Sequence, residues 1–459
     1  MIALFVLLAA MQVETTAPPP EAPRPVRMPR PVQSTLPNGL RIVVAEKHGV
    51  PLVAARLLIA SGNEADPPDL PGLAEMTAAM LTKRTTTRSA EQIARDVEVL
   101  GATLDSGAGW DSSFVAVDVM ASRLPKAMGS MADVVLHPTF PNAELERLRQ
   151  QKIDTIRVML ELLPKLVLRA AAQVVYGDAP YGHIGLTIAS AEAMKREDLI
   201  AFHDRYYTPG NAILVLAGDI TPAEATRLAE EHFGSWKASP PAPVTPGEAK
   251  PPSPRTVIVD LPNAGQAVVV FSRPGVARTD PRYPVAEVMN AILGGGLSSR
   301  LSEEIRIKRG LSYGAYSFFE FRRKGGPFTA GVLTKNESAA EVAGLVAAEM
   351  KRIAEEPAPA GELAARKATL IGNFGRSFET NAGLAQLVGQ LSLYGISLDE
   401  IRHYIESIDS VSPAQVQQFA NELLAGRPSI IIAGDAKKLV DSVKKEFPDV
   451  EVIPASSVK

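Results

Sequence analysis

The sequence predicts an α+β fold of two homologous halves, each a mainly antiparallel sheet covered by helices. Its 459 residues exceed the roughly 100 to 200 residues that usually share one core, so we expect at least two domains. Prolines crowd the stretch between Lys237 and Arg255, a composition that favours extended conformations and forms no core. We therefore expect an N-terminal half over 35–237, a linker over 238–256 and a C-terminal half over 257–459.

The same order of elements is expected on either side of this linker. In each half, two apolar runs with strand character precede a helix, and we expect helices to cover one face of each sheet. These segments are 40–45, 52–60 and a helix from about Gly72 in the first half, and 257–261, 267–271 and a helix from about Pro284 in the second.

Each half also closes on a similar pattern. The run Ala-Ile-Leu-Val-Leu-Ala-Gly-Asp starts at Ala212, and the run Ser-Ile-Ile-Ile-Ala-Gly-Asp starts at Ser429. An apolar strand that ends in Ala-Gly-Asp and leads to an amphipathic helix, repeated in both halves, indicates an internal duplication. Helices are expected after these strands and between the strand pairs, at 90–100, 142–160, 222–232, 339–355 and 437–446.

Composition excludes several classes of protein. A formal net charge of -3 supplies no basic excess to neutralise phosphates, so we expect no nucleic-acid partner. Cysteine is absent, which rules out disulfides, thiolate metal sites and a cysteine nucleophile. The six histidines lack any pair at helical ligand spacing. No Gly-x-Ser-x-Gly elbow is present for a serine hydrolase, and the glycines at 294–296 lack the Lys-Ser/Thr ending of a phosphate-binding loop.

Residues 1–34 read as a signal-like segment followed by a proline-rich tail. The apolar run Ile2–Met11 is too short to span a bilayer but fits the hydrophobic region of a secretory signal, although a basic start is missing. We expect an exported, periplasmic protein without a membrane span. An apolar first strand is the alternative for this run.

The stretch Gly72–Met80 reads Gly-Leu-Ala-Glu-Met-Thr-Ala-Ala-Met. It resembles the helix that carries His-x-x-Glu-His in the pitrilysin/insulinase family of zinc metallopeptidases, the inverzincins. The resemblance places Glu75 and Ala79 at the two histidine positions and Ala78 at the general-base glutamate. Thr155 falls at the third ligand, a glutamate on a downstream helix. It therefore implies a degenerate site with no metal and no cofactor in this chain.

The resemblance spans nearly all of 35–450. It includes Leu-Pro-Asn-Gly-Leu from Leu36, Phe-His-Asp-Arg-Tyr-Tyr-Thr-Pro-Gly-Asn-Ala from Phe202, and Gly-Gly-Gly-Leu-Ser-Ser-Arg-Leu from Gly294. The layout is similar to the shorter, bacterial and mitochondrial-processing-type members, in which two chains face each other around a cavity. It implies a clamshell-type subunit.

The second half keeps another element of the family, an arginine and a tyrosine in Arg-Ile-Lys-Arg-Gly-Leu-Ser-Tyr from Arg306 to Tyr313. In the family, this pair binds the substrate carbonyl at the scissile bond. The chemistry is sound, because a fixed guanidinium and a phenol hydroxyl are preorganised donors for a developing oxyanion. Gly310 suits the end of the helix that carries Arg306, and we expect Tyr313 to start the next strand.

Two hypotheses follow for function. In the first, this chain is the catalytically incomplete subunit of a heterodimeric zinc metallopeptidase and supplies Arg306 and Tyr313 in trans. A homologous partner would carry zinc on an intact His-x-x-Glu-His, and the pair would cleave peptides or unfolded segments that add to a sheet edge as a strand. In the second, the chain is a non-enzymatic peptide-binding or structural subunit. A metal held by Glu75 and a distant histidine is a third possibility.

Overall fold

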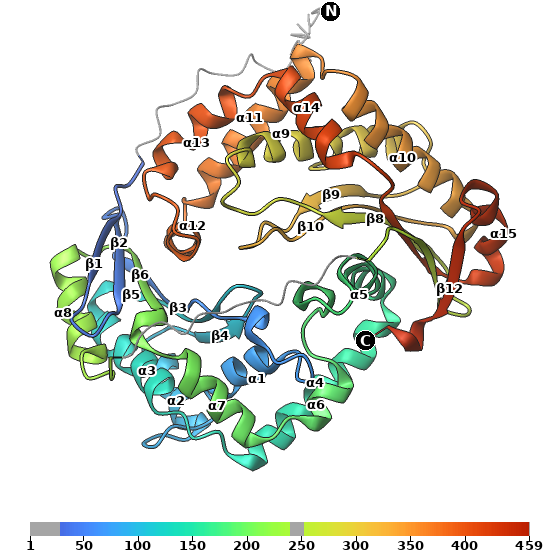
Figure 1. Cartoon of the computed structure of the whole chain (residues 1–459). Helices are drawn as coiled ribbons and strands as arrows, with labels where there is room; N and C mark the ends of the chain where they lie inside the picture. Colours follow the sequence, from blue (N-terminus) through green and yellow to red (C-terminus); the bar gives the residue numbers. More distant parts are fainter. Residues whose placement is uncertain (1–27, 239–251, 459) are drawn as a thin grey trace, which may run out of the picture.

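The computed structural model describes residues 28–238 and 252–458, which form two six-stranded sheets. Figure 1 shows the N-terminal half in the lower part of the view and the C-terminal half above it. The first sheet contains β1 (Val32–Thr35), β2 (Arg41–Glu46), β3 (Leu52–Ile59), β4 (Leu104–Ala108), β5 (Ser113–Met120) and β6 (Ala212–Gly218). The second contains β7 (Thr256–Asp260), β8 (Ala267–Pro274), β9 (Ala315–Phe319), β10 (Pro327–Thr334), β11 (Ser429–Gly434) and β12 (Val450–Pro454).

The topology of the sheets confirms the duplication. The order β2-β6-β3-β5-β4 in the first sheet matches β7-β11-β8-β10-β9 in the second. In both, the strand that ends in Ala-Gly pairs in parallel with the first core strand, and the three following pairings are antiparallel. Only the added edge differs, because β1 is antiparallel to β2 whereas β12 is parallel to β7. The mainly antiparallel α+β fold is therefore confirmed.

The helices begin and end close to their expected positions. Those of the first half are α1 (Leu73–Met80), α2 (Ala90–Glu98), α3 (Leu124–Leu136), α4 (Asn142–Glu161), α5 (Leu163–Tyr176), α6 (Ile188–Ala193), α7 (Arg196–Tyr206) and α8 (Pro222–Phe233). Those of the second are α9 (Tyr283–Leu293), α10 (Ala339–Glu355), α11 (Ala360–Ser377), α12 (Asn381–Leu393), α13 (Glu400–Asp409), α14 (Pro413–Leu424) and α15 (Ala436–Glu446).

Both faces of each sheet are covered, so the expectation that helices cover one face only is wrong. In β6, Leu214 and Leu216 join one core while Ile213 and Val215 join another on the opposite face. Strand residues alternate between faces, and an unbroken apolar run is therefore the pattern of a strand buried on both sides. The run that begins at Ala212 is such a pattern.

The second covering layer comes from the other half of the chain. Helix α12, from the C-terminal half, packs against β2, β3 and β6 of the N-terminal sheet. Its Leu384 and Val388 share a core with Val43, Leu58 and Val215. The contact removes apolar surface of both the helix and the sheet from water, and each Å2 buried stabilises the fold by roughly 25 cal/mol.

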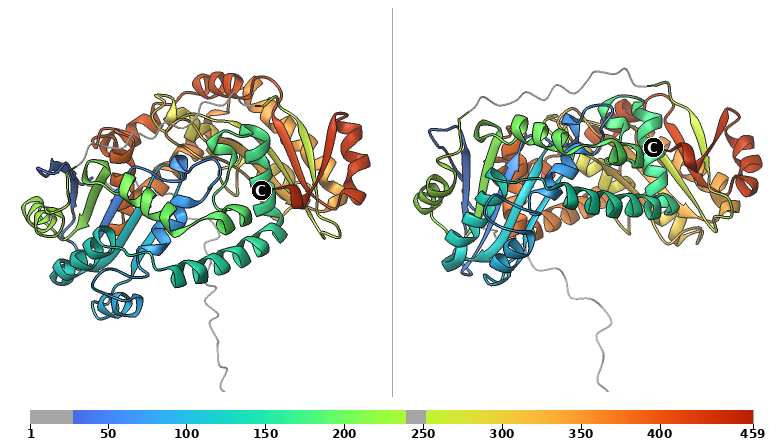
Figure 2. Two further views of the ribbon diagram at one scale, coloured as in Figure 1. Left: turned by 60° about the horizontal axis from the view of Figure 1, so that its bottom comes forward. Right: turned by 90° about the horizontal axis from the view of Figure 1, so that it is seen from below.

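Helix α5 makes the reciprocal contact. It belongs to the N-terminal half but packs against β8 and β11 of the C-terminal sheet, where Leu166 and Ala170 meet Val268, Val270 and Ile431. In each view of Figures 1 and 2, the teal-green α5 lies beside the yellow and red strands of the C-terminal sheet. The two halves therefore exchange one helix each, and each of these helices shares a hydrophobic core with the sheet of the other half.

The expected boundaries need one correction, because β1 starts at Val32, inside the segment assigned to the proline-rich tail. It pairs with β2, so this part of the tail is an edge strand of the first sheet. The signal-like run Ile2–Met11 lies outside the described residues, as do positions 239–251 of the expected linker. Among the helices that the structure describes, none has the length and apolar character needed to cross a membrane.

Candidate functional site

The helix with the degenerate motif, α1, is fixed at its start by buried polar contacts. The Asp66 carboxylate accepts hydrogen bonds from the backbone N–H groups of Gly72, at 2.6 Å, and Ala74, at 2.8 Å. Burial raises the pKa of Asp66 to about 7. Gly72 has a φ of 88°, and a Cβ there would lie 2.5 Å from Cα of Leu186, so only glycine fits this entry.

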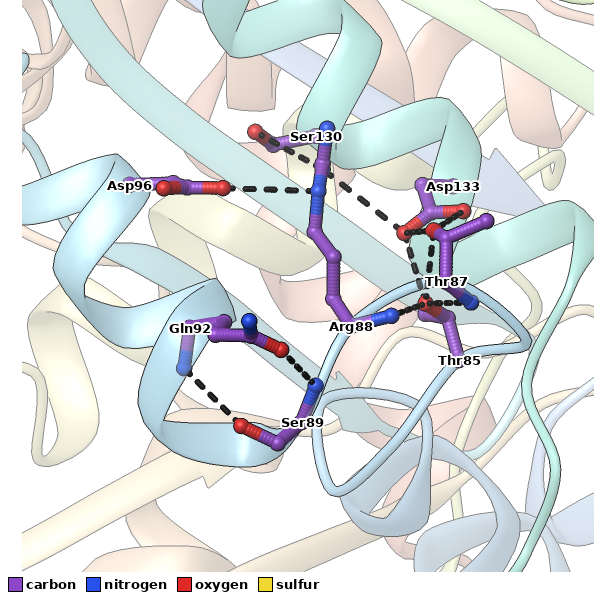
Figure 3. A network of polar contacts seen from close by, with 8 residues as sticks. All are labelled: Thr85, Thr87, Arg88, Ser89, Gln92, Asp96, Ser130 and Asp133. Atoms are coloured by element: carbon purple, nitrogen blue, oxygen red, sulfur yellow. Dashed lines mark hydrogen bonds and ion pairs between the residues drawn. The ribbon is translucent and has the colours of Figure 1, made fainter.

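The turn that follows α1 is fixed as well. Thr85 Oγ1 donates to Asp133 of α3 at 2.7 Å. Figure 3 shows Arg88 between Asp133 and Asp96 of α2, with N···O distances of 3.6 and 3.3 Å. Ser89 caps α2, since its hydroxyl accepts from the backbone N–H of Gln92. Both ends of α1 are therefore held in place.

The residues at the two histidine positions of α1 face different surroundings. Glu75 is half-buried and forms an ion pair with Lys152 of α4. Ala79 is partly buried against the core of the N-terminal half. Burial lowers the pKa of Arg169 on α5, while the negative charge of Glu75 acts in the opposite direction. Glu75 is therefore the anion of a small charge cluster that joins α1, α4 and α5.

The other two motif positions carry no group suited to metal chemistry. Ala78 is fully buried, and its carbonyl accepts a hydrogen bond from Ser106 of β4 at 2.8 Å. Thr155 lies exposed on α4, and its hydroxyl donates to the carbonyl of Gln151 at 2.8 Å. The structure thus pairs Glu75 with Lys152, one turn before Thr155.

This set of residues does not fit a zinc ion. Zinc requires three or four ligands, which are neutral imidazoles, thiolates or carboxylates. Here the only carboxylate at the motif positions is that of Glu75, which is bonded to the Lys152 ammonium group, and Ala78 and Ala79 offer only methyl groups. A cation already occupies the place beside Glu75. In the described ranges 28–238 and 252–458, no three His, Asp or Glu side chains come together as a possible metal site.

Arg306 and Tyr313 lie on a separate segment of the C-terminal half. Arg306 belongs to a π-helical turn over Ser302–Ile307, which is capped by Lys308, and Gly310 follows in the left-handed region with a φ of 63°. Tyr313 does not start a strand, because β9 begins at Ala315. Ser302 Oγ contacts the carbonyls of Gly296, at 3.1 Å, and Ala315, at 3.2 Å. The glycine loop, the π turn and β9 are thereby joined.

The side chains of this pair make no contact that would occupy them. Tyr313 is 96% exposed. In the described part of the chain, neither the Arg306 guanidinium nor the Tyr313 hydroxyl forms a hydrogen bond or ion pair, and no such contact links them to α1. Ile307, next to Arg306 in sequence, is 59% exposed, and Leu297 of the glycine loop is 69% exposed. The structure brings Glu75 to Lys152 but does not bring Arg306 and Tyr313 to Glu75.

The segment that carries the pair is nonetheless anchored. Arg300, which is buried, forms a two-pronged ion pair with Glu362 of α11 at 3.0 and 2.7 Å. Arg366 of α11 also donates to Ser298. Such bidentate contacts restrict rotation as well as position. Tyr313 is thus presented to solvent, and the half-buried Arg306 lies on the same anchored segment.

A buried polar cluster joins the two halves, and no sequence motif indicated it. Arg323, on the loop between β9 and β10, bonds Glu64 through Nε at 3.2 Å and Asp111 through its backbone N–H at 3.0 Å. Tyr394, which follows α12, donates to the same Asp111 at 2.7 Å. The members are far apart in sequence, so only the tertiary structure reveals them.

One carboxyl group of this cluster, that of Glu64, has a strongly shifted pKa. Burial, together with the nearby Asp111, raises the pKa of Glu64 to about 8 against the pull of Arg323. Glu64 Oε2 and Asp111 Oδ1 are buried and lack a hydrogen-bond partner among the described residues. A proton on one of these oxygens would supply the missing donor. Beside them, a cavity of 240 Å3 lies between the halves, lined by Arg56, Trp110, Glu320, Arg322, Gln386 and Gln390 among others.

Known proteins match this chain over most of its length. Residues 41–183 match the family model described as Insulinase (Peptidase family M16), and residues 193–370 match that described as Peptidase M16 inactive domain. An uncharacterized zinc protease of Mycobacterium tuberculosis is 27% identical over 408 residues, 88% of this chain and 93% of the relative. One of Streptomyces coelicolor is 25% identical, covering 88% and 90%.

Solved structures agree. A peptidase M16 inactive domain from Pseudomonas fluorescens superposes with a TM-score of 0.82 at 26% identity, covering 88% of this chain and 98% of that one. A protease from Helicobacter pylori reaches a TM-score of 0.83 at 19% identity, covering 89% and 100% of the two chains, which shows a shared fold. With both family models matched in order and the two-half architecture in common, the chain belongs to the insulinase family, peptidase family M16.

Proposed function

We propose that this chain is the catalytically incomplete subunit of a heterodimeric zinc metallopeptidase. It supplies Arg306 and Tyr313 to the active site of a homologous partner that carries zinc on an intact His-x-x-Glu-His. The observation that carries this proposal is the contrast between its two sites. The ammonium group of Lys152 is bonded to Glu75 at the degenerate motif. The half-buried Arg306 and the exposed Tyr313, by contrast, form no hydrogen bond or ion pair with a described residue and lie on an anchored segment.

The chemistry of the pair fits a role in trans. When water attacks a peptide carbonyl, negative charge develops on the carbonyl oxygen, and preorganised donors stabilise it. The Arg306 guanidinium offers a permanent charge and the Tyr313 hydroxyl one directional donor. A purely structural subunit has no need of two unpaired donors on a rigid support.

The substrate class is peptides or unfolded protein segments. Such chains are recognised through main-chain hydrogen bonds when they add as a strand to a sheet edge. Strands β4 and β9 each end their sheet, so each has one edge without a neighbouring strand in the described residues.

We propose that the partner holds the zinc and that the signal-like start directs this chain to the periplasm.

The test begins with the complex. The tagged chain is purified from its native host, and any co-purified homologue with an intact zinc motif is identified by mass spectrometry. Turnover of a quenched peptide is then compared for complexes with wild-type chain, Arg306→Ala and Tyr313→Phe. Loss of one oxyanion donor typically costs about 100- to 1000-fold in kcat, so a loss of that size with unchanged assembly is expected.

Arg309→Ala is the matched control, since Arg309 is a neighbouring arginine already bonded to Glu304. It is expected to leave turnover within about twofold, as an exposed pair of this kind contributes little. Unchanged turnover in both site variants would contradict the assignment of the pair. Reproducible absence of a partner with an intact motif would favour the alternative, a non-enzymatic peptide-binding or structural subunit.

A further inference from the structure

A second cavity lies in the C-terminal half, and the backbone N–H of its Arg278 donates to the carbonyl of Arg322, which lines the cavity between the halves. It has a volume of 270 Å3 and is bounded by α9, α11, α12 and α13. A neighbouring hollow of 410 Å3 shares four of its residues, Arg278, Tyr283, Glu400 and Tyr404. Neither space is lined by Arg306, Tyr313 or any residue of α1. A cavity of this size accommodates a small molecule or one side chain.

The charges in this cavity do not balance. Arg278 forms an ion pair with Glu400 at 2.6 Å and stacks on the ring of Tyr283 at 3.7 Å, so its charge is matched. Glu287 of α9 also lines the cavity, and it forms no hydrogen bond or ion pair with a described residue. When ionised, Glu287 leaves the cavity with one net negative charge.

The walls beside this carboxyl group are aromatic. Tyr283, Phe374 and Tyr404 all line the cavity, and the rings of Phe374 and Tyr404 stack with centroids 4.0 Å apart. Aromatic faces attract cations through their quadrupole, and the attraction grows when the site is desolvated. An anion, by contrast, would meet the carboxylates of Glu287 and Glu400, and a metal ion would find a single unpaired carboxylate.

We propose that this cavity binds a small organic cation, an alkylammonium group, with Glu287 as its counter-ion and the three aromatic rings as its walls. The group comes either from a free amine or from a lysine side chain, which share the same ammonium chemistry. Binding at this place is independent of the hydrolytic role proposed above, because the two sites share no residue.

The proposal carries a defined pH dependence. Burial raises the pKa of Glu287 to about 7, while Arg278 acts in the opposite direction. Burial also raises the pKa of Tyr283 and Tyr404 above the ordinary range, so neither titrates near neutrality. Glu400 remains bonded to Arg278. Only ionised Glu287 attracts the cation, so affinity is expected to rise about tenfold between pH 6 and pH 8, following the ionised fraction of one group.

The experiment is isothermal titration of the full chain with n-butylammonium at both pH values, with butyrate as the anion of similar size. Binding that tightens with pH, together with no heat from butyrate, is expected. Titration with N-acetyl-lysine methylamide separates the two sources, since binding of this probe as well identifies a lysine side chain and binding of butylammonium alone a free amine. Absence of binding by both cations at tens of millimolar would overturn the proposal.

Glu287→Gln keeps the shape of the side chain and removes its charge, so at least a tenfold loss of affinity and loss of the pH dependence are expected. Glu341→Gln removes the same charge from an exposed position on α10 and is expected to bind like wild type. Equal binding by Glu287→Gln would overturn the assignment. A second variant, Tyr404→Leu, removes one aromatic wall and is expected to weaken butylammonium binding at both pH values. Thermal unfolding verifies that each variant is folded.

Discussion

The α1 region and the π-turn segment differ in how their polar side chains are used. On α1, Glu75 is bonded to Lys152, and Ala78 and Ala79 pack into or against the core. On the segment that contains the π turn, Arg306 and Tyr313 have no such contacts with described residues, while the chain preceding them is anchored through Arg300. The first region has become part of the internal packing, whereas the polar side chains of the second remain available, as the proposed role in trans requires.

The largest effect is expected from restoring the missing general base. Ala78→Glu places a carboxyl group where the side chain is fully buried, and it is expected to lower the free energy of unfolding by about 3 kcal/mol or more. Denaturant unfolding measures this change. Ala79→Glu, at the partly buried neighbour, serves as control and should cost less. Equal and small losses would show that α1 has kept room for a catalytic site.

A smaller effect is expected at the cluster that joins the halves, and it depends on pH. The pKa of Glu64 is raised from its ordinary 4.5 to about 8, so the folded state keeps a proton that the unfolded state loses. The stability from this group is complete below about pH 4.5 and is lost as the pH rises through about 8. Unfolding free energy should therefore fall between pH 5 and pH 8.5.

Glu64→Gln tests this directly, because the amide can still accept from Arg323 but does not titrate. The fall in unfolding free energy over that pH range is expected to be smaller in the variant by at least about 1 kcal/mol, since one pKa unit corresponds to about 1.4 kcal/mol. Asp66 and Glu287, whose pKa values are each raised to about 7, contribute a slope of the same sign in both proteins. Identical slopes for the two proteins would exclude Glu64 as a source.

The smallest effects compare the two regions side by side. Lys152→Ala leaves the half-buried Glu75 without its ion-pair partner and is expected to cost about 1 kcal/mol. Arg306→Ala removes a side chain with no bonded partner among the described residues, so stability should stay within about 0.5 kcal/mol. Thermal unfolding of both variants checks this. A larger loss in Arg306→Ala than in Lys152→Ala would reverse the proposed roles of the regions.

Local patterns allowed much of the fold to be predicted. Helix α10 has the expected bounds, and α4 and α8 extend only one residue further. These bounds were predictable because the apolar periodicity of a helix and the residues that start and end it are local features of the sequence. The Ala-Gly-Asp endings likewise indicated an internal duplication, which the matching places of β6 and β11 in their two sheets confirm. The candidate site was predicted only in part. Motif positions located Arg306 and Tyr313, but the exposure of Tyr313 and the bond between Glu75 and Lys152 depend on residues distant in sequence.

The sequence by itself determined the two-half α+β fold, the family and the loss of both histidines and both glutamates of the zinc motif, since each depends on residue types and short spacings. The tertiary structure alone decided the exchange of α5 and α12 between the halves, the proton-binding cluster at Glu64 and the cavity at Glu287. The physical reason is that burial and charge pairing arise between segments far apart in the chain. A single strand shows that both of its faces are apolar, but not which helix covers them.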